Sequence, residues 1–376
     1  MGCLPSNPFH QNEISEEPLT TENLCRPDKS LSFQFKTMHS LIPGTQSLRN
    51  LINHEVLKIL SYNILADAYI GNSFSYCEQE FKDFSYRGPK IVKFIETLNP
   101  DIFCLQEVDH YNDYYQPFLS KNYHLFQENQ DLYLNVGLLI GFKKNAYKFL
   151  KKTVICYDNY ATEELFEDLK ELTKFKKGHR ALLLEIESFK NMQKYIIVNT
   201  HLHWNPAEED VKQFQTIQLI KYLENRYEKS QEIIICGDFN SLPDSDQIQF
   251  ITKPSFFGPE NNKMWRICDI KNKKLRFVSS YAKYRQKNKR NLHPSFTNLT
   301  ANFKGNLDYI FYNKRSKLEL KRVLKIPKRK ELVALPNKNW SSDHLPIMAE
   351  FLIESDIDKE IGEENEPEHD EAFFNL

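Results

Sequence analysis

Long apolar runs are missing from this 376-residue chain, and none approaches the roughly 20 residues that span a bilayer as a helix. Closely spaced cysteine pairs are missing too, which excludes the common structural zinc sites. The seven cysteines are scattered, and Cys104 and Cys236 lie inside apolar runs, where cysteine behaves as a small hydrophobic residue. This usage fits a reduced, intracellular protein.

Several common catalytic motifs are also absent. The chain contains no P-loop, no G-x-G-x-x-G, no H-E-x-x-H and no G-x-S-x-G pattern. What it does contain is a hydrophobic content of 40% and an aromatic content of 13%, which argue against general disorder. At this length, one large α/β domain is as plausible as two domains.

The net charge of −1 hides a separation of charge along the chain. Between Glu354 and Glu371 there are ten acidic residues and one lysine, which predicts a disordered acidic tail over 354–376. Between Lys271 and Lys330 there are 19 lysines or arginines against two acidic residues. Such a basic stretch is either a solvated surface or, beside a phosphoester site, a contact for a polyanionic substrate.

The first 50 residues are polar, contain prolines and show no periodicity, so we expect a disordered leader over 1–50 that lies outside the core. The sequence opens with MGCLPS, in which Gly2 and Ser6 match the myristoylation pattern and Cys3 is placed for palmitoylation. Two acyl chains would anchor a cytoplasmic protein to a membrane. A chance match is the equally weighted alternative.

Strand-like and helix-like segments alternate over residues 55–353, which predicts one α/β catalytic domain there. Apolar residues recur at helical spacing in YRGPKIVKFIETLNP, where the helix should end before Pro100, and in VKQFQTIQLIKYLENRY. The predicted strands are VLKILSYNIL, DIFCLQEV, VGLLIGF, 181–186, KYIIVNTHLHW, EIIICGDF, NLDYIFY and LPIMAEFLI. This mixture fits sheets covered by helices.

Polar signatures close or flank these strands in a fixed order. Their side chains are carboxylates, amides and imidazoles, namely Asn63, Glu107, His201, Asp238, Asn240, Asp308 and His344. A side chain at a strand end can be buried at its base and exposed at its tip, so neighbouring strand ends would gather these groups in one cleft. Oxygen ligands with histidine and without thiolate suit a Mg²⁺-assisted hydrolysis of a phosphoester.

Each signature also has a purely structural interpretation. Glu107 is a Mg²⁺ ligand or one half of an ion pair at the rim, and Asn63 fixes that carboxylate or a water, or only caps its strand. Asp238 and Asn240 orient a water and a phosphoryl oxygen, or form an Asx turn. His344 shuttles a proton or stabilises charge, or is a satisfied histidine. The catalytic interpretation is favoured because six structural explanations would have to coincide.

Together the segments resemble the endonuclease/exonuclease/phosphatase superfamily and its DNase I-like fold. Within it they resemble the deadenylase branch, which includes carbon catabolite repressor-type deadenylases, nocturnin, the Angel proteins and 2′-phosphodiesterase. The resemblance runs from about Val56 to Leu352 and is carried by LSYNILAD, PDIFCLQEVD, NTHLHWNP with DVKQFQ, IICGDFNSLPDS, SFTNLTANFKGNLDYIFY and SSDHLPIMAEF. It implies a four-layered α/β sandwich, in which two packed, mostly antiparallel sheets are flanked by helices.

The resemblance also implies roles for the residues around the metal. Glu107 would bind Mg²⁺, for which Mn²⁺ could substitute, with Asn63 as a further metal contact. Asp238 and Asn240 would position the nucleophilic water and the phosphate. These four residues would form the centre of the reaction.

The resemblance also implies roles for the histidines and their neighbours. His201 would contact the phosphate, and His344, supported by Asp308, would stabilise the developing charge. His203 and Asp343 would lie against the substrate, although His203 could equally be part of the core.

An adenine would be held between Phe303 and the amide of Asn240, near Pro206, unless Phe303 packs inward as an ordinary strand residue. The segment 135–139 departs from the family pattern, which puts the substrate contacts of that loop in doubt.

The resulting hypothesis is a Mg²⁺-dependent 3′→5′ exoribonuclease that removes 5′-AMP from single-stranded poly(A). The alternative is a phosphatase or phosphodiesterase that acts on a small adenylate, such as a dinucleotide 2′-phosphate or a 2′,5′-oligoadenylate. A non-catalytic RNA-binding module is a further alternative, against which the intact acid, amide and histidine set argues. No leucine-rich-repeat leader is present, so membership of a deadenylation complex does not follow.

Overall fold

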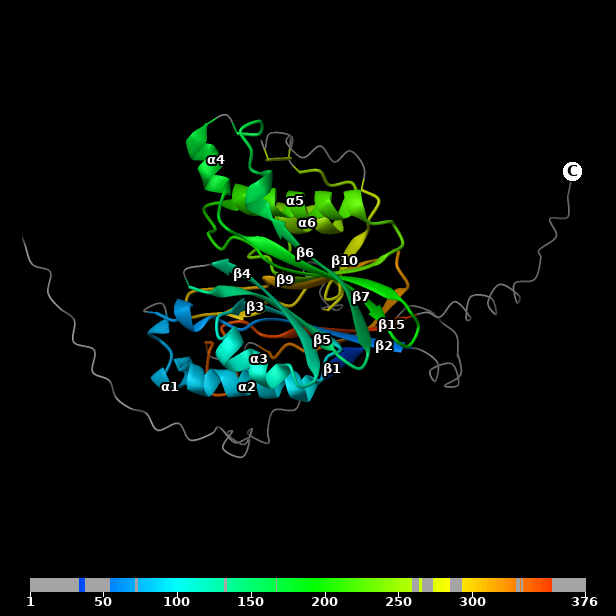
Figure 1. Cartoon of the computed structure of the whole chain (residues 1–376). Coiled ribbons are helices and arrows are strands. Elements are labelled where there is room, and N and C mark those ends of the chain that lie inside the picture. The colour runs from blue at the N-terminus through cyan, green and yellow to red at the C-terminus, as the bar shows by residue number, and fades with distance from the viewer. Residues whose placement is uncertain are drawn as a thin grey trace, which may run out of the picture.

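Two β-sheets pack face to face, with helices on both outer sides (Figure 1). The computed structural model describes residues 34–37, 55–71, 74–131, 134–166, 168–258, 264–265, 273–284, 293–328, 332 and 334–353. This helix–sheet–sheet–helix arrangement confirms the predicted four-layered sandwich. The predictions for Gly2, for Cys3 and for the acidic tail concern residues outside the described part of the chain.

The first sheet has seven strands in the order β1-β14-β15-β2-β3-β5-β4. All its neighbouring strands are antiparallel except β2 and β3, which are parallel. Its strands are β1 (Phe35–Thr37), β2 (Glu55–Asn63), β3 (Ile102–Val108), β4 (Tyr123–Asp131), β5 (Val136–Lys143), β14 (Leu318–Leu324) and β15 (Ile347–Ile353).

The second sheet has six strands in the order β10-β13-β9-β8-β7-β6, and only β8 and β9 are parallel neighbours. Its strands are β6 (Tyr147–Cys156), β7 (Arg180–Ser188), β8 (Lys194–His201), β9 (Glu232–Asp238), β10 (Phe277–Ser279) and β13 (Asp308–Asn313). A separate hairpin is formed by β11 (Asn298–Leu299) and β12 (Lys304–Gly305).

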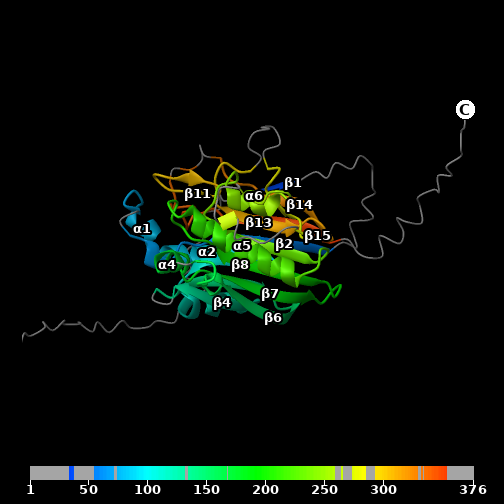
Figure 2. The same cartoon turned by 90° about the horizontal axis from the view of Figure 1, so that it is seen from above.

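Helices cover the outer side of each sheet (Figure 1). Beneath the first sheet are α1 (Gln79–Lys82), α2 (Phe84–Leu98) and α3 (Gln116–Leu119). Over the second sheet, which Figure 2 shows from above, are α4 (Leu169–Phe175), α5 (Glu209–Arg226) and α6 (Asp246–Thr252). Short helical turns lie between a strand and the helix that follows it, at η3 (Asp67–Tyr69), η5 (Tyr111–Tyr115) and η6 (Tyr157–Tyr160).

The apolar strand runs are explained by burial on both faces. On β2, Leu57 and Ile59 join the core between the sheets, whereas Leu60 and Tyr62 pack with Ile91 of α2. Alternate residues of a strand point to opposite faces, so a strand covered on both sides needs apolar residues at nearly every position. Fully burying each such side chain contributes about 1.5–3 kcal/mol. As predicted, α2 ends before Pro100, at Leu98.

The predicted boundary of the leader is wrong for one short segment. β1, at Phe35–Thr37, pairs with β14 at the edge of the first sheet, and the Lys325 N–H donates to the Gln34 carbonyl at 2.8 Å. A strand of three residues is too short to show a periodicity, and its partner lies almost 300 residues away in sequence. Among the described helices, none combines the length and the apolar character that crossing a membrane requires.

Candidate active site

Strand topology gathers the polar signatures at one edge of the sandwich. The parallel pairs β2–β3 and β8–β9 bring their carboxyl ends to this edge, and the two pairs face each other across the core. The antiparallel strands β13 and β15 begin at the same edge, because Asp308 lies opposite Asp238 and Ile347 lies opposite Ser61. The signatures therefore meet although they are far apart in sequence.

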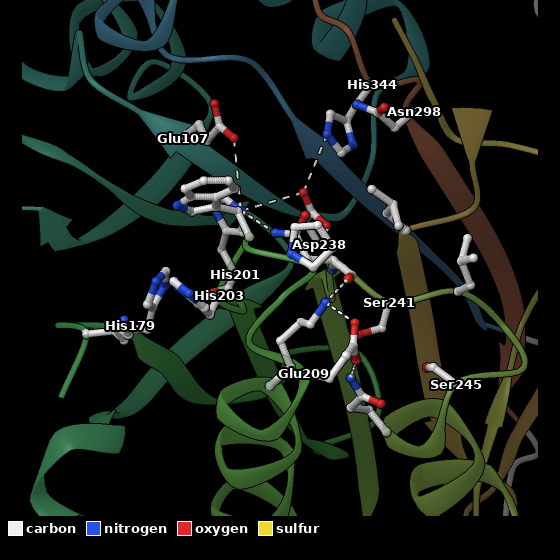
Figure 3. Close-up of a pocket in the computed structure, with 18 of the residues that line it drawn as sticks. Glu107, His179, His201, His203, Glu209, Asp238, Ser241, Ser245, Asn298 and His344 are labelled. Atoms are coloured by element: carbon white, nitrogen blue, oxygen red, sulfur yellow. Dashed lines mark hydrogen bonds and ion pairs between the residues drawn. The ribbon is translucent and has the colours of Figure 1, made fainter. Parts of the chain in front are cut away.

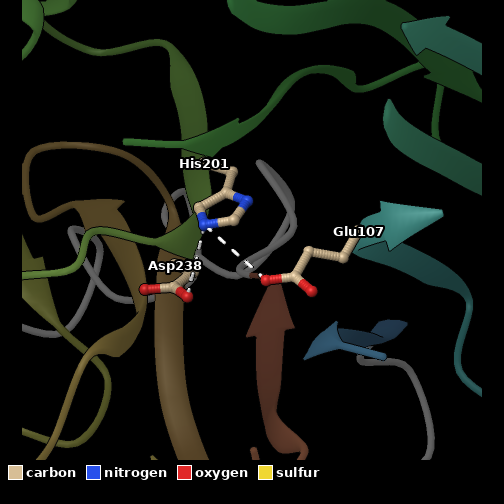
Figure 4. Close-up of side chains that lie close together, drawn as sticks. All are labelled: Glu107, His201 and Asp238. Atoms are coloured by element: carbon tan, nitrogen blue, oxygen red, sulfur yellow. Dashed lines mark ion pairs between the residues drawn. The ribbon is translucent and has the colours of Figure 1, made fainter. Parts of the chain in front are cut away.

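Glu107, His201 and Asp238 point toward one another on the floor of a cavity (Figure 4). The His201 Nε2 atom lies 3.6 Å from Asp238 Oδ2 and 4.0 Å from Glu107 Oε1. The Asn63 side chain joins the two acids, because its Nδ2 donates to Glu107 at 2.8 Å and to Asp238 at 3.0 Å. Its oxygen accepts a hydrogen bond from the Leu65 N–H at 3.1 Å. Asn63 thus orients both carboxylates, and its direct contact with a metal stays a prediction.

An irregularity in β3 aims Glu107 at the cavity. Glu107 has a φ of 58°, and the register of β3 on β5 shifts between Leu105 and Val108. A bulge of this kind redirects a side chain that would otherwise lie along the sheet. The Ala66 N–H holds the second carboxylate oxygen at 3.1 Å. Burial raises the pKa of the Glu107 carboxyl, and the neighbouring His201 offsets part of this rise.

Two further signature residues hold the sheets together below the site. Gln106 Nε2 donates to Asn199 Oδ1 at 2.7 Å, and Asn199 Nδ2 donates to the carbonyls of Leu105 at 2.8 Å and Leu139 at 3.1 Å. Gln106 belongs to the first sheet and Asn199 to the second, and both are fully buried. Their amides fix the relative position of the strands that carry Glu107 and His201.

The turn after β9 is both an Asx turn and part of the site. The Asn240 N–H donates to Asp238 Oδ1 at 2.8 Å, which is the local hydrogen bond that the structural interpretation predicted. The Asn240 side-chain amide lies 3.1 Å from His201 Nε2 and donates to the Leu202 carbonyl at 3.0 Å. Asn240 therefore connects Asp238 to His201.

His344 forms a buried pair with Asp308. Its Nδ1 lies 2.8 Å from Asp308 Oδ2, and its Nε2 lies 3.4 Å from Asp238 Oδ2. Burial lowers the pKa of the His344 imidazole, but Asp308, Asp238 and Asp343 raise it more and hold that pKa well above 6.5. Ser342 fixes the loop, because its hydroxyl donates to the Asn63 carbonyl at 2.7 Å and accepts from the His344 N–H at 3.1 Å.

The residues predicted to bind substrate line the cavity, which has a volume of about 1470 Å³. Figure 3 shows part of this lining, including His203. Phe303 lies in the β11–β12 turn and is 43% exposed, so the alternative of an inward-packed strand residue is wrong. Pro206 and Asp343 also line the cavity, and Asp343 accepts from the Asn298 side chain at 3.1 Å. His203 borders the cavity but is buried, and its Nε2 contacts Glu208 at 2.6 Å.

The sequence analysis did not single out several cavity residues, including Tyr69, His179, Arg180, Lys212, Leu242 and Asn298. They come from five different segments of the chain, and none stands at the carboxyl end of an apolar run. Trp204 ends the predicted strand KYIIVNTHLHW, and the sequence leaves its place, like that of His203, open between the site and the core. The segment 135–139 contributes Val136 to the cavity, at the start of β5.

The residues of the floor fit a hard divalent cation. Glu107, His201 and Asp238 each offer one ligand atom, and these atoms lie within 4.8 Å of one another, as do those of Asp238, Asp308 and His344. In the second group, the pKa of His344 lies well above 6.5, so its protonated imidazole already places a positive charge there. The first group places two carboxylates together beside a histidine, which suits Mg²⁺ or Mn²⁺ better.

Comparison with known proteins agrees with this geometry. Residues 60–344 match the Endonuclease/Exonuclease/phosphatase family. The chain belongs to this family. Its relatives place it in the deadenylase branch, as the sequence analysis expected.

Three members of the family illustrate the similarity. The chain is 30% identical over 371 residues to the probable CCR4-Not complex 3′-5′-exoribonuclease subunit Ccr4 of Vairimorpha ceranae, covering 91% of this chain and 75% of that protein. It is 27% identical to 2′,5′-phosphodiesterase 12 of Homo sapiens, covering 92% of this chain but only 63% of that longer protein.

The crystal structure of ANGEL2, a 2′,3′-cyclic phosphatase, in complex with adenosine-2′,3′-vanadate superposes with a TM-score of 0.69 and 23% identity. It covers 86% of this chain and 99% of the ANGEL2 chain, and at this identity the likeness shows the fold, which is DNase I-like.

Proposed function

We propose that this protein is a Mg²⁺-dependent 3′→5′ exoribonuclease that removes 5′-AMP from single-stranded poly(A). The observation that carries the proposal is the convergence of Glu107, Asp238, His201 and His344 on one cavity, with the buried Asp308 paired to His344. The name of the Vairimorpha relative, a 3′-5′-exoribonuclease subunit, supports the direction of cleavage.

The residues divide the work of phosphoester hydrolysis. The metal, held by Glu107 with His201 and Asp238 beside it, would supply positive charge for the phosphoryl oxygens. Asp238 and Asn240 orient the attacking water and the phosphate, since their turn fixes the carboxylate toward the cavity.

The protonated His344 imidazole lies beside Asp238, with its Nε2 3.4 Å from Oδ2 of that carboxylate. From there it stabilises the charge that develops on the phosphate and on the leaving 3′-oxygen. Water attacks phosphorus, the bond from phosphorus to the 3′-oxygen of the shortened RNA breaks, and 5′-AMP is released.

Adenine is proposed to bind at the Phe303 side of the cavity. The Phe303 ring is exposed there, near Leu242, and Asn240 and Pro206 line the same cavity. A base that stacks on an aromatic ring gains about 1–3 kcal/mol.

A small adenylate is the second candidate substrate. The relative named 2′,5′-phosphodiesterase 12 and the adenosine-2′,3′-vanadate in the ANGEL2 structure favour it. The same floor residues would serve either substrate, because both reactions break a phosphorus–oxygen bond at an adenosine.

A substrate comparison separates the two candidates. We would incubate the purified chain with Mg²⁺ and an end-labelled all-A RNA, and in parallel with a dinucleotide 2′-phosphate and a 2′,5′-oligoadenylate. The proposal expects a ladder of shortened RNA with AMP as product, and no turnover without metal. If only the small substrates are turned over, the second candidate function replaces the exoribonuclease assignment. If RNA binds but no substrate is turned over, the protein is a non-catalytic RNA-binding module.

Glu107→Ala tests the metal site directly. We expect at least about a hundredfold loss in kcat/KM, because the substitution removes a ligand that acts in the transition state. Glu96→Ala is the matched control, since Glu96 is an exposed glutamate on α2 far from the cavity lining. Equal activity of Glu107→Ala and the wild-type chain would remove Glu107 from the mechanism.

Acylation of Gly2 and Cys3 is proposed separately, on the MGCLPS pattern alone, as the means by which a cytoplasmic enzyme reaches a membrane. Gly2→Ala should then move the protein from the membrane to the soluble fraction of a cell lysate. An unchanged distribution would end this proposal without touching the catalytic one.

A further inference from the structure

Trp204 presents a large aromatic ring at the active-site cavity. It is 68% exposed and lines the cavity, whereas Trp265 is 4% exposed and Trp340 packs against the core. Its ring contact within the described residues is with His203, at a centroid distance of 6.1 Å and a tilted angle of 49°. A tryptophan left open at a catalytic cavity indicates a surface that a ligand covers.

The backbone on both sides of Trp204 is fixed. The His203 N–H donates to Gln215 Oε1 at 2.9 Å, and the His203 ring contacts Glu208 at 2.6 Å. On the other side, Asn205 Nδ2 donates to the same Glu208 carboxylate at 3.3 Å. The indole is therefore held by an ordered loop. The free-energy cost of ordering the protein is then small when a ligand stacks on the ring.

Trp204 and Phe303 reach the cavity from different segments of the chain. Trp204 follows β8, in the connection to α5, whereas Phe303 lies in the β11–β12 turn beside Leu242. The cavity volume of about 1470 Å³ exceeds the roughly 300–1,000 Å³ of sites that take one small ligand. The cavity thus has room for more than the nucleotide whose base lies on Phe303.

Basic side chains lie on the same cavity lining as Trp204. Lys177 and Arg180 contribute to it, and they pair with Glu208 at 3.1 Å and with Glu128 at 2.7 Å. Aromatic rings interleaved with basic groups are typical of surfaces that bind a single-stranded nucleic acid, because the bases stack and the phosphates meet positive charge.

We propose that Trp204 is the stacking platform for a second base of a single-stranded polynucleotide, distinct from the base at Phe303. The inference rests on the proposed function and narrows it, because a substrate that contacts both rings is a nucleotide chain and not a mononucleotide. Trp204 then contributes to the affinity for polynucleotides and does not change the affinity for a single nucleotide.

Binding measurements test this inference independently of turnover. In the Glu107→Ala background, which prevents cleavage, we would titrate hexa-adenylate RNA and, separately, AMP, and follow tryptophan emission and fluorescence anisotropy. Trp204→Ala should weaken hexa-adenylate binding by about tenfold, the loss expected for one stacked base, and leave AMP binding unchanged. Trp204→Phe should retain most of the affinity, and hexa-adenylate should quench emission only when Trp204 is present.

Phe189→Ala is the matched control, because Phe189 is 55% exposed and lies outside the cavity lining. The inference is overturned if Trp204→Ala binds hexa-adenylate as tightly as the background, if it loses AMP binding equally, or if the background binds no hexa-adenylate. Absence of turnover by the wild-type chain on every substrate would instead overturn the proposed function, and it leaves these binding results valid.

Discussion

Asn240 is held in a left-handed backbone conformation, with a φ of 46°, by contacts on several sides. One of them is Lys212 of α5, which is 2% exposed and whose Nζ donates to the Asn240 carbonyl at 3.1 Å. Lys212 also pairs with Glu209 at 2.5 Å. Conformations of this kind cost free energy and persist where the surroundings enforce them. Lys212 is thus a positioning residue for the turn between Asp238 and Asn240.

Lys212→Met keeps the length of the side chain and removes its hydrogen bond. We expect a fall in kcat of about tenfold or more with a smaller change in KM, because a misplaced turn affects orientation more than binding. Lys221→Met, on the same helix, is the control. A change in KM alone would assign Lys212 to substrate binding, and a loss of folding by circular dichroism would assign it to stability only.

His179 provides a prediction for the pH dependence of stability. Burial, together with His201 and His203, lowers its pKa to about 3, and its Nδ1 contacts the His201 carbonyl at 3.0 Å. The unfolded chain binds a proton at this residue below pH about 6.5, whereas the folded chain does not until pH about 3. The wild-type chain therefore loses stability at this site as the pH falls from about 6.5 to about 3.

His179→Asn should remove part of that loss. The thermal midpoint of the wild-type chain should fall by several degrees more than that of the variant between neutral and acidic pH. His124→Gln, at an exposed histidine, should follow the wild-type curve. Parallel curves for the wild-type chain and His179→Asn would mean that His179 titrates alike in the folded and unfolded states.

The β11–β12 hairpin shows how a whole element shapes the base site. Phe303 lies against Gly305, where an added Cβ would meet the Phe303 ring at 2.6 Å and Leu242 Cδ2 at 2.9 Å. The missing side chain at Gly305 lets the Phe303 ring, which lines the cavity, approach the backbone of the hairpin. The hairpin itself is attached to the site, because the Leu299 N–H donates to the Asp343 carbonyl at 3.0 Å.

Gly305→Ala should therefore displace the Phe303 ring without removing it. We expect KM for adenylate substrates to rise by about tenfold, comparable to the loss of one stacked base, while kcat changes little. Gly71→Ala is the control, because nothing lies within 4 Å of a Cβ at that position. An unchanged KM would show that the Phe303 ring does not support the base.

Elements buried on both faces were the ones that sequence patterns predicted. β2, β3, β8 and β9 lie inside their sheets, and their apolar runs follow from that burial. β4 and β6 are edge strands with mostly part-exposed or exposed residues, so they carry no apolar run and the sequence analysis did not predict them. A strand that is covered on one face leaves a weaker signal than one that is covered on two.

The site depends on how the two sheets pack, because each sheet contributes some of its side chains. Glu107 and His344 are carried by the first sheet and its flanking loop, whereas His201 and Asp238 end strands of the second. The amides of Gln106 and Asn199 connect the sheets below them. A cation bound between the sheets should consequently stabilise the entire fold.

Metal addition tests this coupling. Mg²⁺ should raise the thermal midpoint, and a hundredfold excess over its dissociation constant corresponds to about 2.7 kcal/mol of added stability. Glu107→Ala should abolish the shift, Glu96→Ala should retain it, and a chelator should reverse it. Equal shifts in both variants would place the cation elsewhere on the molecule.

Strand ends were the part of the site that the sequence predicted. Asn63, Glu107, His201, Asp238 and Asn240 each follow or end an apolar run, and a run that must be buried defines where its polar end emerges. The predicted helix before Pro100 had a local basis in helical periodicity. The two-sheet architecture was instead implied by the resemblance to a known family, and the strand order confirms it.

Tertiary structure decided which residues surround those strand ends. Trp204, His179, Lys212 and Asn298 reach the cavity from connections, a helix and a hairpin, and nothing in their local sequence fixes where these elements pack. Local patterns report which side of a segment is buried, because burial selects apolar residues one position at a time. Neighbours across the cavity depend on how the two sheets and their helices stack, which is a property of the folded chain as a whole.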